Sequence, residues 1–415
     1  MHKNRQKIVV IGLGYIGLPT ASMLATKGHQ VLGVDVNESA VNTINQGSIH
    51  IVEPDLDILV RSAVHSGNLK ASLVPEEADT FILAVPTPFS TSDHGLKIPD
   101  ISYIEAATRS IAPFLREGNL VILESTSPVG TTERIGQIIA ELRPDLVTSR
   151  SSQQANLAIH LAHCPERVLP GHILRELVDN DRIIGGVNRA AAETARDLYK
   201  TFCNGGIFLT DSKTAEMAKL VENSSRDVSI AFANELSIIC DKLGINVWEL
   251  IELANKHPRV NILQPGPGVG GHCIAVDPWF IVAAAPDEAR LIRTAREVND
   301  AKPNWVLDKV KSKADRFKNP VIGCLGLAFK ANIDDLRESP ALEITRKLIK
   351  ADIGQVMACE PNASDDFCEF ALFDLSDVLQ KADIILLLVD HNEFKQIDNE
   401  LLKEKVLIDT RGILR

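Results

Sequence analysis

One cysteine closes a glycine-rich stretch of the chain. Residues 265–280 read P-G-P-G-V-G-G-H-C-I-A-V-D-P-W-F, with four glycines ahead of Cys273 and Asp277 four residues after it. Glycine lets a ligand approach the main chain closely, so such a loop can present a thiol to a small molecule. Asp277 is near enough to hold a water or another polar group beside the thiol. A Gly/Pro turn with a buried structural cysteine is the alternative, and this stretch alone does not separate the two.

A second set of reactive groups lies on a predicted helix. Residues 214–243 contain neither Gly nor Pro, which predicts one long helix. At about 100° per residue, Lys219, Asn223 and Arg226 share one face of it. A lysine there can act as a general acid or base, or as a cation beside a developing oxyanion. A solvated polar face is the alternative, and the otherwise apolar helix also suggests a dimer seam.

Two further charged segments stand near these groups in the chain. His257 and Arg259 precede the Cys273 loop in H-P-R-V-N-I, and an arginine there suits a phosphate or a carboxylate. Glu166 and Arg167 lie between prolines, shortly before a strand predicted over residues 182–187. The second pair can line a cleft or form solvated surface, and both interpretations stay open.

The N-terminal segment predicts a dinucleotide site. A strand at 7–11 is followed by Gly12, Gly14 and Gly17, then by a helical run and a second strand that ends at Asp35. This is the complete G-x-G-x-x-G fingerprint, in which pyrophosphate lies at a helix N-terminus and the acid binds ribose hydroxyls. Because an acid repels a 2′-phosphate, we expect NAD and not NADP.

Two more buried strands, at 80–86 and 120–124, continue the α/β alternation. Ligands of open α/β sheets bind outside the carboxyl ends of the strands. Thr87, Ser125 and Thr126 follow these ends, where a nicotinamide would lie. Hydroxyls that cap the following helices are the plainer alternative, and both roles are compatible. A polar loop is expected over 148–154.

A second, smaller βαβ pattern begins at residue 321 and lacks the glycine fingerprint. Lys330, Arg337 and Arg411 stand at its strand ends, where a nucleotide-type ligand would meet cations. The predicted fold is therefore α/β, with an N-terminal Rossmann domain, a long central helical connector and a C-terminal Rossmann-like domain. The expected domains are residues 1–200, 201–304 and 305–415.

Composition limits the class of protein. The 415 residues carry a formal charge of −11, which argues against a general nucleic-acid binder. Seven scattered cysteines without a C-x-x-C pair favour free thiols in a reducing compartment over disulfides or a metal site. The N-terminus runs directly into a strand, and no apolar run reaches the roughly 18–20 residues of a membrane span. We expect a cytoplasmic protein that does not enter a membrane.

Together these segments resemble the UDP-glucose/UDP-mannosamine dehydrogenase family over essentially the whole chain. The motifs that carry the resemblance are G-L-G-Y-I-G-L-P, V-P-T-P, E-S-T-S-P-V-G, P-E-R, A-E-M-A-K-L-V-E-N, G-V-G-G-H-C, G-L-A-F-K and D-D-L-R-E-S-P. Residues 257–280 look like the members that act on UDP-N-acetyl-D-mannosamine. UDP-glucose dehydrogenases tend to have Phe after the cysteine and Lys before the aspartate, where this chain has Ile274 and Val276.

The resemblance implies a four-electron oxidation of the sugar C6 by two NAD⁺, in bacterial surface polysaccharide synthesis. An aldehyde has no second hydride to give until a nucleophile adds to it, and a thiol both adds and leaves well. The resemblance therefore implies a thiohemiacetal and then a thioester on Cys273, which water releases as the uronate. The catalytic residues implied are Cys273, Lys219, Asn223, Asp277, Thr126 and Glu166.

The same resemblance implies the binding residues. Cofactor contacts are implied for Gly12, Gly14, Tyr15, Ile16, Gly17, Asp35, Thr87, Thr126 and Arg337. Sugar-nucleotide contacts are implied for Arg167, Val168, Lys219, Asn223, Arg226, His257, Arg259, Gly271, Phe329, Lys330 and Arg411. In this family the arginine matching Arg259 reaches the neighbouring subunit's site, which implies a homodimer.

Three alternatives compete with this hypothesis. The nearest is a 6-dehydrogenase of another UDP-sugar, UDP-GlcNAc or UDP-glucose. An NAD-binding scaffold protein with a dead site would have lost Cys273 or Lys219, and both are present. A two-electron 6-phosphogluconate-type or hydroxyacid dehydrogenase needs neither the cysteine nor the second α/β unit.

Overall fold

The chain forms two compact units in a computed structural model. The structure describes residues 5–51, 53–91, 97–150, 155–169, 171–271, 273–363 and 369–414. The units comprise residues 1–221 and 222–415, and helix α8 (Ser212–Leu243) contributes residues to both. Each unit is described by itself below.

The first unit is built on an eight-stranded sheet with the order β12-β11-β10-β7-β4-β1-β2-β3. All neighbouring strands are parallel except β10 and β11. The strands are β1 Lys7–Ile11, β2 Gln30–Val34, β3 Leu69–Ser72, β4 Thr80–Leu83, β7 Leu120–Leu123, β10 His160–His163, β11 Arg182–Gly186 and β12 Ile207–Asp211. Two separate hairpins are β5 Phe89–Thr91 with β6 Lys97–Pro99, and β8 Val147–Arg150 with β9 Ala155–Leu157.

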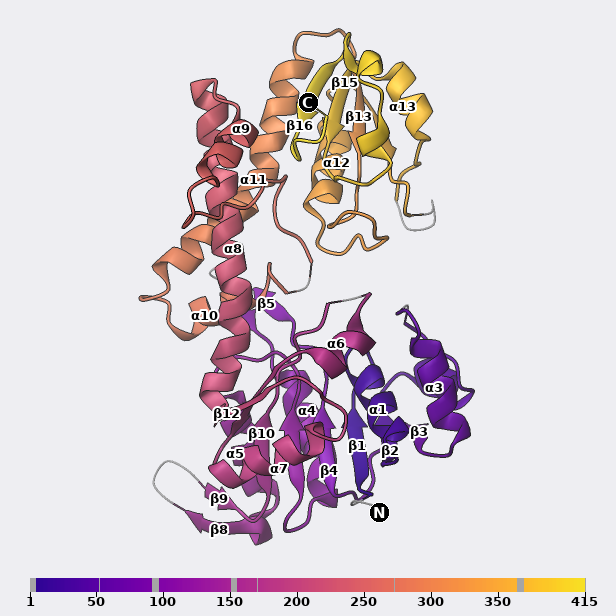
Figure 1. Cartoon of the computed structure of the whole chain (residues 1–415), viewed down its shortest axis with the longest axis vertical. Helices are drawn as coiled ribbons and strands as arrows, with labels where there is room; N and C mark the ends of the chain where they lie inside the picture. Colours follow the sequence, from indigo (N-terminus) through magenta and orange to yellow (C-terminus); the bar gives the residue numbers. More distant parts are fainter. Residues whose placement is uncertain are drawn as a thin grey trace. The chain divides into compact units, whose positions relative to one another are not determined.

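Helices cover both faces of this sheet (Figure 1). Alternate residues of β1 show why, because Ile8 and Val10 enter one hydrophobic cluster while Val9 and Ile11 enter another. A strand buried on both faces is a near-continuous apolar run, as the sequence predicts. The helices are α1 Gly17–Thr26, α2 Glu38–Asn45, α3 Leu56–His65, α4 Ser102–Ile111, α5 Thr131–Leu142, α6 Ile173–Asp179 and α7 Arg189–Tyr199.

The second unit combines helices with a four-stranded parallel sheet of order β14-β13-β15-β16. Helices α11 and α12 pack on one face of this sheet and α13 on the other (Figure 1). The strands are β13 Val321–Leu325, β14 Gln355–Cys359, β15 Ile384–Leu387 and β16 Val406–Asp409. The helices that follow α8 are α9 Val247–Ala254, α10 Asp277–Ala284, α11 Arg290–Ala314, α12 Pro340–Ala351 and α13 Leu375–Lys381.

The predicted α/β class is confirmed, with one exception in the local predictions. The expected loop at 148–154 is wrong over its first part, because residues 148–150 pair with β9 as strand β8, while 151–154 lie outside the described residues. Helix α11 continues past the expected boundary after residue 304 and includes Pro303. Val306, Leu307 and Val310 pack into the core of the C-terminal sheet, and this packing stabilises the helix beyond residue 304. Among the described residues, no helix is both long and apolar enough to cross a membrane.

Candidate active site

The turn after β1 leaves room for a ligand at one glycine and packs tightly at two others. Gly12 has φ +90°, and a Cβ there would lie 2.5 Å from the carbonyl oxygen of Ala84. A Cβ on Gly17 would lie 1.8 Å from the carbonyl oxygen of Gly12. At Gly14 nothing lies within 4 Å of the added atom. Gly12 and Gly17 are thus required by packing, and Gly14 faces the open space that a pyrophosphate would need.

The acid at the end of β2 braces this turn. Asp35 accepts hydrogen bonds from the backbone N–H of Leu13 at 2.8 Å and of Asn37 at 2.9 Å. Helix α1 begins at Gly17 with no side-chain cap, so its positive end is left for an anion. Tyr15 is exposed beside the turn. These residues fit a dinucleotide, with its pyrophosphate at α1 and a ribose at Asp35.

Hydrogen bonds connect the predicted hydroxyl groups at the carboxyl ends of β4 and β7. The Oγ1 of Thr87 donates to the carbonyl oxygen of Thr126 at 2.6 Å, and the Oγ of Ser125 donates to that of Val85 at 2.7 Å. The structure therefore brings Thr87 and Thr126 together, as the order of the strands predicts.

Sequence reasoning missed the residue that fixes this loop to α8. Glu216 is buried and accepts from the N–H of Gly130 (2.6 Å), the N–H of Thr132 (2.7 Å) and the Oγ1 of Thr132 (2.6 Å). It thereby caps the N-terminus of α5, and burial raises its pKa despite these donors. Lys219 follows one turn later and is only 9% exposed. The stretch A-E-M-A-K places this acid three residues before Lys219, but its hydrogen-bond partners lie on another element and leave no signal in the local sequence.

Glu166 lies in a buried ion pair and not on a solvated surface. Its Oε2 lies 3.2 Å from Nη1 of Arg182, and its Oε1 accepts from the N–H of Arg167 at 2.7 Å. The Arg182 guanidinium stacks 4.8 Å from the ring centroid of Tyr199, whose hydroxyl donates to Glu124 at 2.6 Å. Burial, with a smaller contribution from Glu166, raises the pKa of Glu124 to about 7. These contacts fix Glu166 in one position.

Two expected sugar-nucleotide contacts follow Glu166 directly. Arg167 and Val168 are half-buried, and the Nη2 of Arg167 donates to the carbonyl oxygen of Asp181 at 2.5 Å. The main chain around β11 thus holds this arginine.

In the second unit, Cys273 is exposed, while the other cysteines that the structure describes are buried. The carbonyl oxygen of Cys273 accepts from the N–H groups of Val276 (3.0 Å) and Asp277 (2.9 Å) in the turn that starts α10. Asp277 is 3% exposed and its Oδ2 accepts from Nδ2 of Asn223 at 2.5 Å. The backbones of Asp277 and Cys273 are therefore joined in one turn, and the Asp277 carboxylate is held by Asn223; the role of this carboxylate beside the thiol stays a prediction.

The glycines before Cys273 let the loop lie against the C-terminal sheet domain. A Cβ on Gly270 would lie 2.4 Å from the carbonyl oxygen of Glu338, and one on Gly271 would lie 3.0 Å from the Phe329 ring. At the start of the loop, Nη1 of Arg411 donates to the carbonyl oxygen of Pro265 at 3.3 Å. The structure thus brings together Gly271 and Phe329, two of the expected substrate contacts.

A buried polar network, which the sequence did not reveal, supports the same loop. The Oδ1 of Asn234 accepts from the N–H of Gly266 at 2.9 Å, and its Nδ2 donates to Asn299 at 2.8 Å. Asn299 in turn donates to Asp227, which pairs with Arg296 at 2.5 Å. Burial raises the pKa of Asp227 despite this pairing. The network ties α8 and α11 to the loop.

The turn after β13 repeats the arrangement of the turn after β1. Gly326 has φ +90°, and Glu360, after β14, accepts from the N–H groups of Leu327 (2.7 Å) and Ala328 (2.9 Å). Glu360 also contacts Nε2 of the buried His391 at 3.1 Å. This network holds the chain just before Phe329.

Two of the remaining cationic residues expected to contact ligands, Arg337 and Arg411, each form an ion pair of their own. Arg337 pairs with Asp335 at 2.6 Å, and Arg411 pairs with Asp390 at 2.9 Å. The other expected contacts, Arg226, His257, Arg259 and Lys330, are exposed. Their roles stay predictions. In the part of the chain that the structure describes, no group of three or more His, Cys, Asp or Glu is placed to hold a metal ion.

Comparison with protein families matches nearly the whole chain. Residues 6–203 match the NAD binding domain of the UDP-glucose/GDP-mannose dehydrogenase family, residues 213–301 its central domain and residues 323–415 its UDP binding domain. The NAD binding match covers the Gly12–Asp35 turn, and the UDP binding match covers Phe329 and Arg411.

Individual relatives agree with this match. The chain is 60% identical to an NDP-N-acetyl-D-galactosaminuronic acid dehydrogenase of Ralstonia nicotianae, over 98% of this chain and 96% of the relative. It is 55% identical to the UDP-N-acetyl-D-mannosamine dehydrogenase of Escherichia coli K12, over 98% and 99%. The solved structure of the UDP-N-acetyl-mannosamine dehydrogenase Cap5O from Staphylococcus aureus superposes with a TM-score of 0.87 at 44% identity, covering 99% of this chain and 96% of that one. The chain therefore belongs to the UDP-glucose/GDP-mannose dehydrogenase family and is an NAD-dependent UDP-sugar dehydrogenase.

Proposed function

We propose that the protein oxidises UDP-N-acetyl-D-mannosamine at C6 to the uronate, in two oxidation steps joined by a covalent adduct on Cys273. The observation that carries this proposal is the exposed Cys273 thiol on the glycine loop that packs against Phe329. The buried cysteines of the described chain have no comparable access. The similarity to UDP-N-acetyl-D-mannosamine dehydrogenases supports the choice of sugar.

The chain's own groups divide the chemistry between them. When bound, NAD⁺ accepts one hydride in each oxidation step. Lys219 would stand beside the reacting oxygen and stabilise its developing charge. The Sγ of Cys273 adds to the C6 aldehyde to give a thiohemiacetal, and loss of the second hydride leaves a thioester. Water then attacks the thioester carbon, so that the uronate and the free thiol are released.

Other residues position these reactants. Asn223, held by Asp277 at 2.5 Å, would orient the oxyanion or the attacking water. Thr126, whose carbonyl oxygen accepts from the Thr87 hydroxyl at 2.6 Å, would also help to position the oxyanion or the water. Glu166, fixed by Arg182, would take the proton of the attacking water. The proposal also includes a homodimer, in which Arg259 completes the site of the partner subunit. We propose that this homodimer is cytoplasmic and that it acts in bacterial surface polysaccharide synthesis.

The test is the amount of NADH released per UDP-N-acetyl-D-mannosamine consumed. Two NADH are expected, with little turnover of UDP-glucose or UDP-GlcNAc. Cys273→Ala should form no uronate and still bind NAD, whereas the control Cys240→Ala removes a buried thiol and should still release two NADH. One NADH per sugar in the unmodified enzyme would show that the reaction stops at the aldehyde and would overturn the role of Cys273.

A second candidate substrate is the N-acetyl-D-galactosamine nucleotide. The relative at 60% identity bears the name NDP-N-acetyl-D-galactosaminuronic acid dehydrogenase, and its identity exceeds the 55% shared with the E. coli relative. The same assay with UDP-N-acetyl-D-galactosamine decides between the two sugars. Two NADH from that sugar alone would keep the thiol mechanism and replace the substrate.

A further inference from the structure

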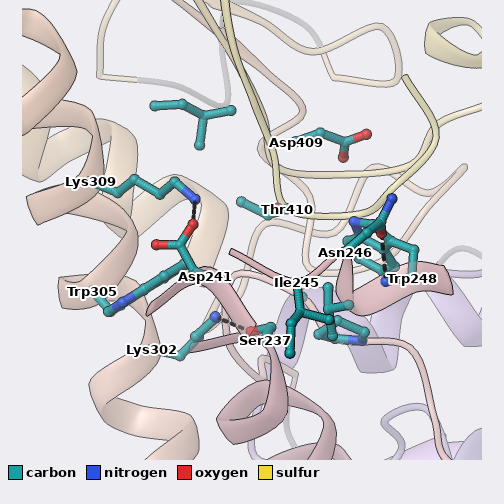
Figure 2. A pocket seen from close by; sticks show the side chains of 14 residues that line it. Ser237, Asp241, Ile245, Asn246, Trp248, Lys302, Trp305, Lys309, Asp409 and Thr410 are labelled. Atoms are coloured by element: carbon teal, nitrogen blue, oxygen red, sulfur yellow. Dashed lines mark hydrogen bonds and ion pairs between the residues drawn. The ribbon is translucent and has the colours of Figure 1, made fainter. Parts of the chain in front are cut away.

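The second unit contains a cavity that the catalytic proposal does not use. It has a volume of about 260 Å³ and lies among the C-terminal half of α8, the start of α9, α11 and the end of β16. Figure 2 shows the side chains that face it, including two indole rings, Trp248 and Trp305. The backbone of Pro265 and Gly266, at the start of the Cys273 loop, completes the wall. None of the residues implied for catalysis, cofactor or sugar-nucleotide contact lines it.

Three of the four charged groups in the wall have their charge engaged. Asp241 and Lys309 form an ion pair with each other (Figure 2). Asp409 is saturated by the backbone, because its Oδ1 accepts from the N–H groups of Arg411 (2.8 Å) and Gly412 (2.6 Å) and its Oδ2 from that of Leu414 (2.8 Å). Asp241 still acts on the neighbouring Lys302 charge, but the like charge of Lys309 opposes it.

Lys302 is the fourth charged group, and it is only 2% exposed. Its Nζ donates to the Oγ of Ser237 at 2.5 Å and lies 3.8 Å from the ring centroid of Trp305. Among the described residues, no carboxylate lies within ion-pair distance of it. A buried ammonium group without a counter-ion is costly, and burial lowers the pKa of Lys302 to about 7. An anion in the cavity would compensate this charge.

We propose that this cavity binds a small organic anion. Its oxyanion would lie on the Lys302 ammonium, which keeps N–H groups to donate besides the one given to Ser237 at 2.5 Å. The Ser237 hydroxyl itself donates to the carbonyl oxygen of Asn234 at 2.6 Å, so it holds the lysine in place and does not donate to the anion. Its flat or apolar body would lie among the indole rings of Trp305 and Trp248 and the side chains of Ile245 and Ile408. A buried lysine with a single hydroxyl partner fits a carboxylate, sulfonate or phosphate ester, and the volume limits the ligand to about one ring and its acidic group.

The test compares 4-fluorobenzoate with 4-fluorobenzamide by ¹⁹F NMR titration of the full chain without substrate. The two probes share one shape and differ in charge. We expect the benzoate to bind at least tenfold more tightly than the benzamide. Equal affinity of the two probes would overturn the proposal, and this arm needs no variant.

A matched pair of variants assigns the binding to Lys302. Lys302→Met keeps the length of the side chain and removes its charge, and should weaken benzoate binding at least tenfold. Lys311→Met, on the same helix and outside the cavity, should leave it unchanged. If Lys302→Met binds benzoate as the unmodified chain does, Lys302 is only structural and the proposal fails. Lys302→Arg, which keeps the charge, shows whether a loss reflects charge or misfolding.

The affinity should also depend on pH, and the sign follows from the lysine. Protonated Lys302 attracts the anion, so binding should be tighter at pH 6 than at pH 8. Asp241 and Lys309, from α8 and α11, and Asp409, from β16, also face the cavity. The Lys302→Met variant serves as the reference for them, and the pH dependence should be absent from it. An identical pH profile in both proteins would contradict the assignment.

Discussion

Glu124 directly follows strand β7, is 1% exposed, and accepts a hydrogen bond from the Tyr199 hydroxyl at 2.6 Å. Its pKa is raised from 4.5 to about 7, mainly because burial penalises the charged form. The folded protein therefore binds a proton more readily than the unfolded chain does. Between these two pKa values, stability falls as pH rises.

Glu124→Gln removes this titration and keeps an oxygen that can accept from Tyr199. Relative to the unmodified protein, the variant should gain stability as pH rises from 4.5 to 7, by about 3 kcal/mol in total. Urea unfolding midpoints of both proteins at pH 5, 6, 7 and 8 measure this gap. A gap that stays constant over the series would show that Glu124 is ionised in the fold with its ordinary pKa.

At the scale of elements, the turn after β1 and the turn after β13 have similar backbone geometry but differ in the space that they leave for a ligand. Gly12 and Gly326 share φ +90°, and in each unit an acid after the second strand accepts from the backbone of the turn. In the first unit Gly14 leaves open space, while in the second Ala328 is buried at the corresponding position. Glu360 is also occupied by His391. The second turn therefore lacks the open space that Gly14 leaves in the first, in agreement with the absence of the G-x-G-x-x-G fingerprint from this part of the sequence.

Glu216 joins two elements of the first unit, and its removal should disturb both. Glu216→Ala leaves three donors of α5 without their acceptor, which should cost about 3 kcal/mol. It also releases the Thr126 loop from the helix that carries Lys219, so kcat should fall about tenfold. Thermal unfolding midpoints and steady-state rates measure the two effects.

Glu235→Ala on the same helix is the control, because Glu235 is exposed. It should change stability by less than about 0.5 kcal/mol. If both variants behave alike, the three hydrogen bonds of Glu216 do not position the loop. A loss of stability with unchanged kcat would limit Glu216 to a capping role.

Local sequence patterns predicted the helices and strands. The residues that the sequence did not identify are those whose contacts are distant in sequence. Strand β1 begins and ends at the predicted residues and helix α8 ends at the predicted Leu243, because apolar runs and turn residues are local signals. The Gly12–Asp35 turn and Cys273 were found through motifs. Glu216, the Asp227–Arg296 pair and Lys302 were not, since their partners lie on other elements and nothing in the local pattern identifies them. Strand β8 was not predicted because these residues form a strand only through pairing with β9.

At the scale of the whole molecule, the proposed homodimer makes one prediction that concerns its subunits. If Arg259 completes the partner's site, Cys273→Ala and Arg259→Ala should each be nearly inactive alone. Random exchange of subunits gives half mixed dimers, each with one intact site of two, so activity should return to about a quarter of normal. NADH release after mixing and refolding measures it.

The control mixes Cys273→Ala with Cys273→Ser, which leaves no intact site and should stay inactive. Size-exclusion chromatography with light scattering establishes that the mixtures are dimeric. Dimers that remain inactive after mixing would show that Arg259 serves its own subunit. Monomers of 45.3 kDa would remove the shared site altogether.

The distribution of thiols has a consequence for how the protein meets oxidants. Cys164, Cys203, Cys240, Cys324 and Cys359 are buried, and Cys273 is exposed. Peroxide reacts with accessible thiolates and not with buried thiols, so the first oxidation among these cysteines should fall on the Sγ that the proposed mechanism uses. A sulfenic acid there would stop uronate formation while the core stays intact, and an added thiol would restore the enzyme. Oxidative stress would thus switch off sugar oxidation without unfolding the protein.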